Sequence, residues 1–166
     1  MSTVESHNEA ILTARAGKYL TFLISRERYA VEILKVQEII GVPKITRVPC
    51  AASYIKGVIN LRGKIIPVVD LRARFGITIR EYDELTCIVI VRIQVSEQPV
   101  LVGVIVDTVL DVMDFTKNEI EPTPDYGVSL DTRYVQGIGR KKEAGLHVLL
   151  HIDSVVKAED VAVASA

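Results

Sequence analysis

Two histidines and three aspartates have a spacing that could suggest a metal site. His147 and His151 are four residues apart. The residues around them alternate like a strand, so their side chains would point to one face about 13 Å apart, which suits no metal ion. We interpret both as ordinary surface or barrel residues. Asp107, Asp111 and Asp114 recur along an expected helical face, and we interpret them as its solvated side. The sequence therefore predicts no metal site.

The residue sets that enzymes use are absent from the chain. Cys50 and Cys87 have neither disulfide nor metal-site spacing, and we expect two reduced thiols in a cytoplasmic protein. The sequence contains no glycine-rich phosphate loop, nucleophile elbow or spaced cysteine–histidine set. An enzyme is therefore disfavoured, and we expect no cofactor.

The composition restricts the classes of partner. Lys plus Arg number 20 and Asp plus Glu 21, for a formal net charge of −1, which gives no general attraction for nucleic acids or anionic membranes. Aromatic residues make up 5% with no Trp, so a barrel that binds nucleic acid or a small ligand is a disfavoured second class. The longest apolar stretch, residues 100–106, is far shorter than the roughly 20 residues of a membrane-spanning helix. Residues 1–17 lack the apolar core of a signal peptide. Since 49% of the residues are hydrophobic, we expect apolar surface patches that bind other proteins.

Short β-branched segments separated by turn residues predict a mainly β fold. Hairpin patterns occur around residues 24–28, 62–63, 96–99 and 140–145. These hairpins and one or two single strands would make about ten strands, and closed barrels hold so many short strands without exposed edges.

The chain also contains an internal repeat. Residues 30–40 align without gaps with residues 103–113, residues 54–58 with 134–138, and residues 65–75 with 146–156. In the first block, alternation changes to the spacing i, i+3, i+4 of Val36, Ile39 and Ile40, which predicts a strand leading into about two turns of helix. The second copy has a longer loop near residues 115–132. We therefore expect two similar barrels.

One segment of the first copy has a specific resemblance. Residues 54–75 read Tyr-Ile-Lys-Gly-Val-Ile-Asn-Leu-Arg-Gly-Lys-Ile-Ile-Pro-Val-Val-Asp-Leu-Arg-Ala-Arg-Phe, and this segment closely resembles the signature segment of the CheW family. Residues 33–39 resemble the first helical turn of that family, and the likeness extends from about residue 18 to residue 157. The chain departs from the family at Cys50-Ala51-Ala52, where an Asn, any residue and a Pro are usual, and its turn at residues 140–145 is unusually basic.

The resemblance implies a non-enzymatic adaptor. Family members fold as two five-stranded SH3-like β-barrel subdomains that share a core, with short helices including one near the C-terminus. They bind the cytoplasmic tips of methyl-accepting chemoreceptors and the CheW-like regulatory domain of the histidine kinase CheA, in rings that network receptors into arrays. By resemblance we expect a cytoplasmic protein that joins these arrays through its partners, with no bound nucleic acid and no insertion into the membrane.

The expected domain organisation follows from the same resemblance and from the repeat. A single CheW-like domain should cover residues 18–157, with a first barrel at about residues 18–84 and a second at about residues 85–157. Residues 1–17 and 158–166 should be flexible tails.

The resemblance implies a receptor-binding groove between the barrels. The expected helix after residue 35 would line this groove, with receptor contacts from Val36, Glu38 and Ile39. Val104 and Val109 are their counterparts in the second copy and could complete the groove. Core packing is an equal alternative for the apolar members of this set.

A hairpin tip is the expected contact with the kinase. Gly63 can adopt the positive φ that a tight turn requires. The resemblance places Arg62 beside the mouth of the barrel, where its planar guanidinium can engage a carboxylate, and Glu38 is the candidate partner. We expect Arg62 and Gly63 to take part in ring contacts with the kinase regulatory domain.

The insertion of the second copy is another expected ring contact. It contains Pro122, Pro124 and Tyr126, and prolines lower the entropy that a loop loses on docking. A plain surface loop is the alternative.

Overall fold

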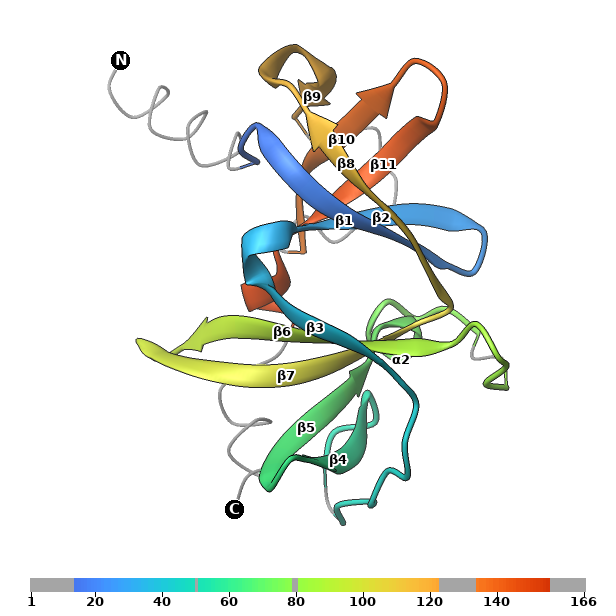
Figure 1. Ribbon diagram of the computed structural model, residues 1–166, viewed down its shortest axis with the longest axis vertical. Helices are drawn as coiled ribbons and strands as arrows, with labels where there is room; N and C mark the ends of the chain where they lie inside the picture. The colour runs from blue at the N-terminus through green and yellow to red at the C-terminus, as the bar shows by residue number, and fades with distance from the viewer. Residues whose placement is uncertain (1–13, 50, 79–80, 123–133, 156–166) are drawn as a thin grey trace.

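The computed structural model describes residues 14–49, 51–78, 81–122 and 134–155. Within these ranges the chain is mainly β, as predicted, and it forms two sheets that lie one above the other in Figure 1. Nearly all residues of the two predicted tails lie outside the described ranges, but Ala14 packs against the buried cluster around Tyr19 and Phe115. No helix of the described ranges is long and apolar enough to span a membrane.

The first sheet, at the top of Figure 1, has six strands in the order β8-β1-β2-β11-β10-β9. Its bounds are β1 (Gly17–Ile24), β2 (Glu27–Glu32), β8 (Thr108–Phe115), β9 (Ile120–Glu121), β10 (Val135–Lys141) and β11 (Gly145–Leu150).

The second sheet has five strands in the order β3-β6-β7-β5-β4. Its bounds are β3 (Val36–Gly41), β4 (Ile55–Leu61), β5 (Lys64–Asp70), β6 (Cys87–Val95) and β7 (Gln98–Val106). The four predicted hairpins are therefore all present, as β1–β2, β4–β5, β6–β7 and β10–β11. Short helices connect the strands: η1 (Ile33–Lys35), α2 (Leu71–Arg74), η2 (Lys117–Glu119) and η3 (Ile152–Ser154).

Both sheets close on themselves. In the first, β8 and β9 stand at opposite ends of the strand order but follow one another in the chain, with only the short η2 between them. In the second, the chain after β3 reaches the far edge of the same sheet, where Thr46 and Val58 exchange backbone hydrogen bonds of 2.9 and 2.8 Å. Each sheet is thus a small barrel without a long free edge.

The pairing registers confirm the internal repeat. The parallel contact of β2 with β11 pairs Ala30 with Leu149, and the parallel contact of β7 with β5 pairs Gly103 with Val68. These four residues are counterparts in the sequence alignment. Bulges also recur at counterpart positions, because the ladder of β3 with β6 skips the residue after Val36, and the ladder of β8 with β1 skips the residue after Val109.

The barrels do not coincide with the two halves of the sequence. We expected one barrel at about residues 18–84 and the other at about 85–157. Instead β1 and β2 join the strands of residues 108–150, and β3 to β5 join β6 and β7. The copies have exchanged their first hairpins, because η1 directs β3 to the edge of β6 and the β7–β8 link directs β8 to the edge of β1.

The predicted two-turn helices are wrong. Residues 36–40 lie in β3 and residues 109–113 lie in β8, and the helical part at this place is only the single 3-10 turn η1. The bulges explain the misleading pattern, because an extra residue in a strand interrupts its alternation and leaves apolar residues at i, i+3 and i+4.

A shared core lies between the barrels, as expected. The largest buried cluster includes Phe22 of β1, Val89 of β6 and Leu71 of α2. The guanidinium of Arg74 lies 4.2 Å from the ring centroid of Tyr54 and 5.1 Å from that of Tyr134. These two tyrosines are counterparts in the repeat, so α2 joins equivalent points of the two barrels.

Candidate functional site

The β4–β5 turn projects a charged side chain from the second barrel. Arg62 and Gly63 both have positive φ, 51° and 87°, as expected for a two-residue hairpin turn that matches the twist of its strands. The side chain of Asn60 accepts a 2.9 Å hydrogen bond from the amide of Gly63. The side chain of Arg62 is 68% exposed.

Arg62 forms an ion pair with Glu38, the partner expected from the sequence. Its Nη1 donates a 3.2 Å hydrogen bond to Oε2 of Glu38, and its Nη2 donates to Oε1. This hydrogen bonding lowers the pKa of Glu38 below its usual value, so the carboxylate stays ionised near neutral pH. The pair joins a residue expected at the kinase contact to one expected in the receptor groove, which places the two expected sites next to each other.

Strand β3 carries three of the residues that were expected in the receptor groove. Val36 is half-buried and packs against the shared core, whereas Ile39 is 44% exposed. Glu38 directly precedes Ile39 in the regular part of the strand, so the two side chains point to opposite faces. Of this segment, Ile39 is the apolar side chain available to a partner.

The two counterparts from the second copy do not line an open groove. Val104 is only 2% exposed and belongs to the shared core, so its expected receptor contact is wrong. Val109 is half-buried and also packs against that core. Core packing, the alternative to a receptor contact, therefore explains why both positions are apolar.

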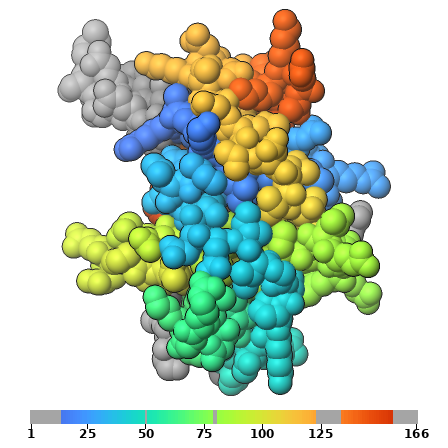
Figure 2. All heavy atoms as spheres, viewed as in Figure 1, coloured from blue at the N-terminus to red at the C-terminus, as the bar shows by residue number. Residues whose placement is uncertain are grey.

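Sequence reasoning missed an exposed aliphatic surface at the junction of the barrels. Figure 2 shows β8 directly beside η1 and β3 on one face of the molecule. These neighbouring elements carry the exposed side chains Leu34, Ile39, Leu110 and Val112, which we call the junction surface. Leu34 is 92% exposed. Val112 is the repeat counterpart of Ile39, and that correspondence was the signal available in the sequence.

Two of the three cations in the basic turn of the first barrel are neutralised within that barrel. Arg140 pairs with Glu121 at 3.0 Å, and Lys141 pairs with Glu119 at 2.9 Å. These pairs tie the β10–β11 hairpin to η2 and β9 and account for Arg140 and Lys141 of the basic turn. Pro122 is exposed just after β9, while Pro124 and Tyr126 lie outside the described residues.

The aspartates and histidines that could suggest a metal site have other surroundings. Asp107 pairs with Arg72 at 3.0 Å, and Asp111 and Asp114 lie on strand β8 rather than on a helix. His147 is fully buried on β11 against the ring of Phe115, so of the two expected alternatives it is a barrel residue and not a surface residue, and burial lowers its pKa. His151 contacts the hydroxyl of Ser154. The part of the chain that the structure describes contains no cluster of three possible metal ligands.

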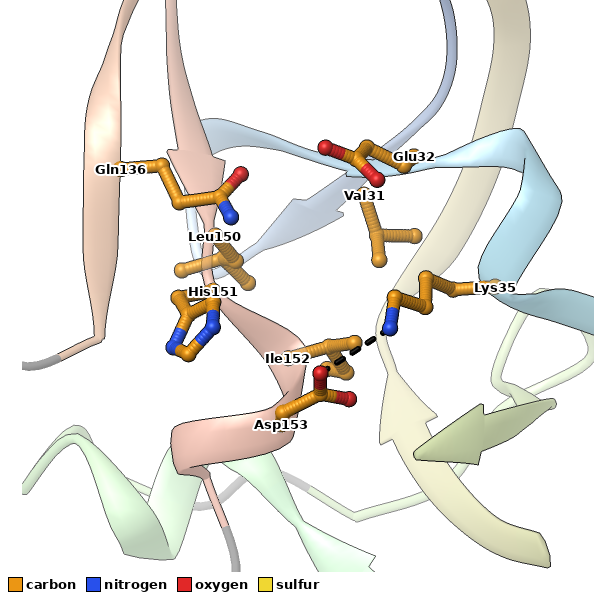
Figure 3. Close-up of a pocket in the computed structure, with 8 residues that line it drawn as sticks. All are labelled: Val31, Glu32, Lys35, Gln136, Leu150, His151, Ile152 and Asp153. Carbon is orange, nitrogen blue, oxygen red and sulfur yellow. Dashed lines mark hydrogen bonds and ion pairs between the residues drawn. The ribbon is translucent and has the colours of Figure 1, made fainter. Parts of the chain in front are cut away.

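A small cavity lies between η1, β10, β11 and η3. Figure 3 shows its polar lining, with Lys35 paired to Asp153 at 2.9 Å and the amide of Gln136 directed inward. Gln136 Oε1 is buried and accepts no hydrogen bond from the described residues. The cavity volume of about 10 Å³ has room for a single water molecule rather than a substrate.

Fold and surface thus define a class: two interlocked small barrels with exposed apolar side chains where they adjoin. The CheW-like domain model matches residues 18–160, so the chain belongs to the CheW-like family, a family of scaffolds and adaptors.

The relatives are chemotaxis proteins. "Chemotaxis protein CheW" of Klebsiella aerogenes is 38% identical over 145 residues, which cover 87% of this chain and 84% of the relative. The protein of that name from Bacillus subtilis is 40% identical over 115 residues, 69% of this chain and 70% of the relative. The crystal structure of the scaffolding protein TtCheW from Thermoanaerobacter tengcongensis has a TM-score of 0.76 and 35% identity, and the match covers 87% of this chain and 97% of that one.

Proposed function

We propose that this chain is a non-enzymatic cytoplasmic adaptor that couples methyl-accepting chemoreceptors to the histidine kinase CheA. The observation that carries the proposal is the junction surface, where neighbouring elements of the two barrels carry exposed aliphatic side chains. Exposed apolar patches of this kind mark protein-binding sites. Family membership supports the choice of chemotaxis components as the partners.

The receptor tip is the proposed ligand of the junction surface. A receptor hairpin is an α-helical structure, and helices bind with apolar side chains along one face. Ile39 of β3 and Leu110 and Val112 of β8 offer such a ligand apolar contacts on both barrels. Ring contacts with the kinase regulatory domain are assigned to Arg62, Gly63 and the loop that contains Pro122, Pro124 and Tyr126.

Replacing Ile39 with Asp is expected to weaken receptor binding by roughly 1–3 kcal/mol and kinase binding much less. A buried carboxylate at an apolar contact costs desolvation, while the fold tolerates the change because the side chain is already exposed. Tyr126→Ala should have the opposite selectivity. Affinities of the purified variants for a soluble receptor fragment and for the kinase regulatory domain measure both effects.

The matched control is Leu146→Asp, which alters an exposed leucine outside the junction surface. Equal loss of both partners by folded Ile39→Asp would replace the two surfaces with one shared site.

Arg62→Ala should leave the melting temperature nearly unchanged and weaken kinase binding about tenfold. The ion pair with Glu38 is exposed and contributes little to folding, but it fixes the guanidinium for a partner. Arg62→Lys keeps the charge without the planar fork, so it should rescue binding only partly. A large fall in melting temperature with normal binding would instead assign Arg62 a structural role.

A further inference from the structure

Residues 41–69 of the second barrel carry five cations. Residues 41–69 contain no Asp or Glu. Of the cations in this run, Arg62 pairs with Glu38. The others form no ion pair with any residue of the described ranges: Lys44, Arg47, Lys56 and Lys64.

Two of these cations border a hollow in the surface. Its volume is about 430 Å³, within the usual range of binding pockets. Arg47, Ser53 and Lys56 supply its polar lining, and Ala51 and Ile55 are among its apolar residues. The hollow therefore combines positive charge and a hydroxyl group with an apolar wall.

Backbone hydrogen bonds connect two sides of the hollow. The hydrogen bonds between Thr46 and Val58 hold the segment that carries Arg47 against the strand that carries Lys56. Pro49 in the wall restricts the backbone further. Two sides that are already held together lose less conformational entropy when a ligand binds between them.

The closing segment of the first barrel, by contrast, contains acids that neutralise cations of the β10–β11 hairpin. There the closing segment supplies Glu119 and Glu121, which neutralise Lys141 and Arg140. In the second barrel the repeat counterpart of Glu121 is Thr46, since Glu121 pairs with Ile138 as Thr46 pairs with Val58. The carboxylates that the first barrel provides internally are therefore missing from the closing segment of the second.

We propose that the hollow bordered by Arg47 and Lys56 binds a carboxylate-rich segment of a partner protein. Carboxylate side chains of that segment supply the counter-charge that residues 41–69 lack, and the apolar wall accommodates an aliphatic side chain between them. A flat anionic membrane could not fill a recess of this kind. This site lies outside the junction surface and does not depend on the identity of the receptor or the kinase.

The test uses the full chain labelled with ¹⁵N and a glutamate-rich peptide that contains two leucines. At low salt we expect saturable chemical-shift changes centred on the amides of Arg47, Ser53 and Lys56. The same peptide with every Glu replaced by Gln should bind at least about tenfold more weakly, and high salt should weaken the Glu peptide strongly.

Charge-reversal variants decide where the peptide binds. The double variant Arg47→Glu/Lys56→Glu should lose at least about tenfold in affinity, while the control Arg26→Glu/Lys117→Glu, which reverses exposed cations elsewhere, should bind normally. Arg47→Gln/Lys56→Gln provides a milder second variant if the reversal disturbs folding. Absence of saturable binding, equal effects of the two reversals, or binding of phosphatidylglycerol vesicles but not of the peptide would overturn the proposal.

Discussion

Gly57→Ala is expected to open the second barrel at its closing bridge and to lower the free energy of unfolding by about 3 kcal/mol or more. Gly57 has φ 146°, and a Cβ at this position would lie 2.1 Å from the carbonyl oxygen of Thr46. That atom belongs to the backbone and accepts the amide of Val58, so it cannot move away without breaking the bridge. The loss should appear in denaturant unfolding and in faster hydrogen exchange at the amides of Thr46 and Val58.

The repeat supplies graded controls for this prediction. Gly137 is the counterpart of Gly57, and a Cβ there would lie 2.8 Å from the carbonyl oxygen of Glu121, without a positive φ, so Gly137→Ala should cost less. Gly41 has no atom within 4 Å of such a Cβ, and Gly41→Ala should be nearly neutral. An equal cost for the substitutions at Gly57 and Gly41 would contradict this explanation of barrel closure.

Arg72→Met is expected to destabilise the fold by roughly 3–5 kcal/mol, because it leaves a buried carboxylate without its counter-charge. The side chains of Arg72 and Asp70 are only 1% and 0% exposed. Nη2 of Arg72 donates to Oδ2 of Asp70 at 2.9 Å, and Nη1 donates to Oδ1 of Asp107 at 3.0 Å. Asp107 also accepts the amide of Ser25 from the β1–β2 turn, so this network links α2 and the second barrel to the first.

A double-mutant cycle separates the network from simple side-chain loss. Arg72→Met combined with Asp70→Asn removes both charges, so the double variant should cost clearly less than the sum of the single variants. Arg26→Met, which alters an exposed cation of the β1–β2 turn, should leave the free energy of unfolding nearly unchanged. Additive single costs would mean that the two buried charges do not depend on each other.

The local features of the fold could be predicted from the sequence because they depend on near neighbours. Alternating apolar residues and turn residues identified the four hairpins, and Gly63 identified a tight turn. The repeat alignment identified counterpart residues that the strand registers confirm. The motif around Gly57 and its copy around Gly137 recur because each barrel needs a close backbone approach at the same place.

The exchange of hairpins between the barrels could not be predicted in the same way. Because the two copies have similar strands, each first hairpin has two similar edges available, and only long-range packing decides between them. In addition, the bulges at counterpart positions space the apolar residues after Val36 and Val109 as in a helix, which led to the wrong prediction of helices there.

The sequence predicted the ion pair of the candidate site, but it could not predict which aliphatic residues of the site are exposed. The Arg62–Glu38 pair is present. Val104 and Ile39, by contrast, are both aliphatic residues in β-branched runs, and only the folded chain separates a core residue from an exposed one. Leu34 and Leu110 gave no signal because an exposed leucine has no sequence pattern of its own.

The central claim is that one molecule binds a receptor and the kinase at the same time. The most direct measurement mixes the purified chain with a soluble receptor signalling tip and the regulatory domain of CheA, and determines the mass of the complexes by size-exclusion chromatography with light scattering. We expect a single peak that contains all three proteins, in which Ile39→Asp removes the receptor fragment and keeps the kinase domain. Two binary complexes that displace one another, with no species containing all three proteins, would contradict the account.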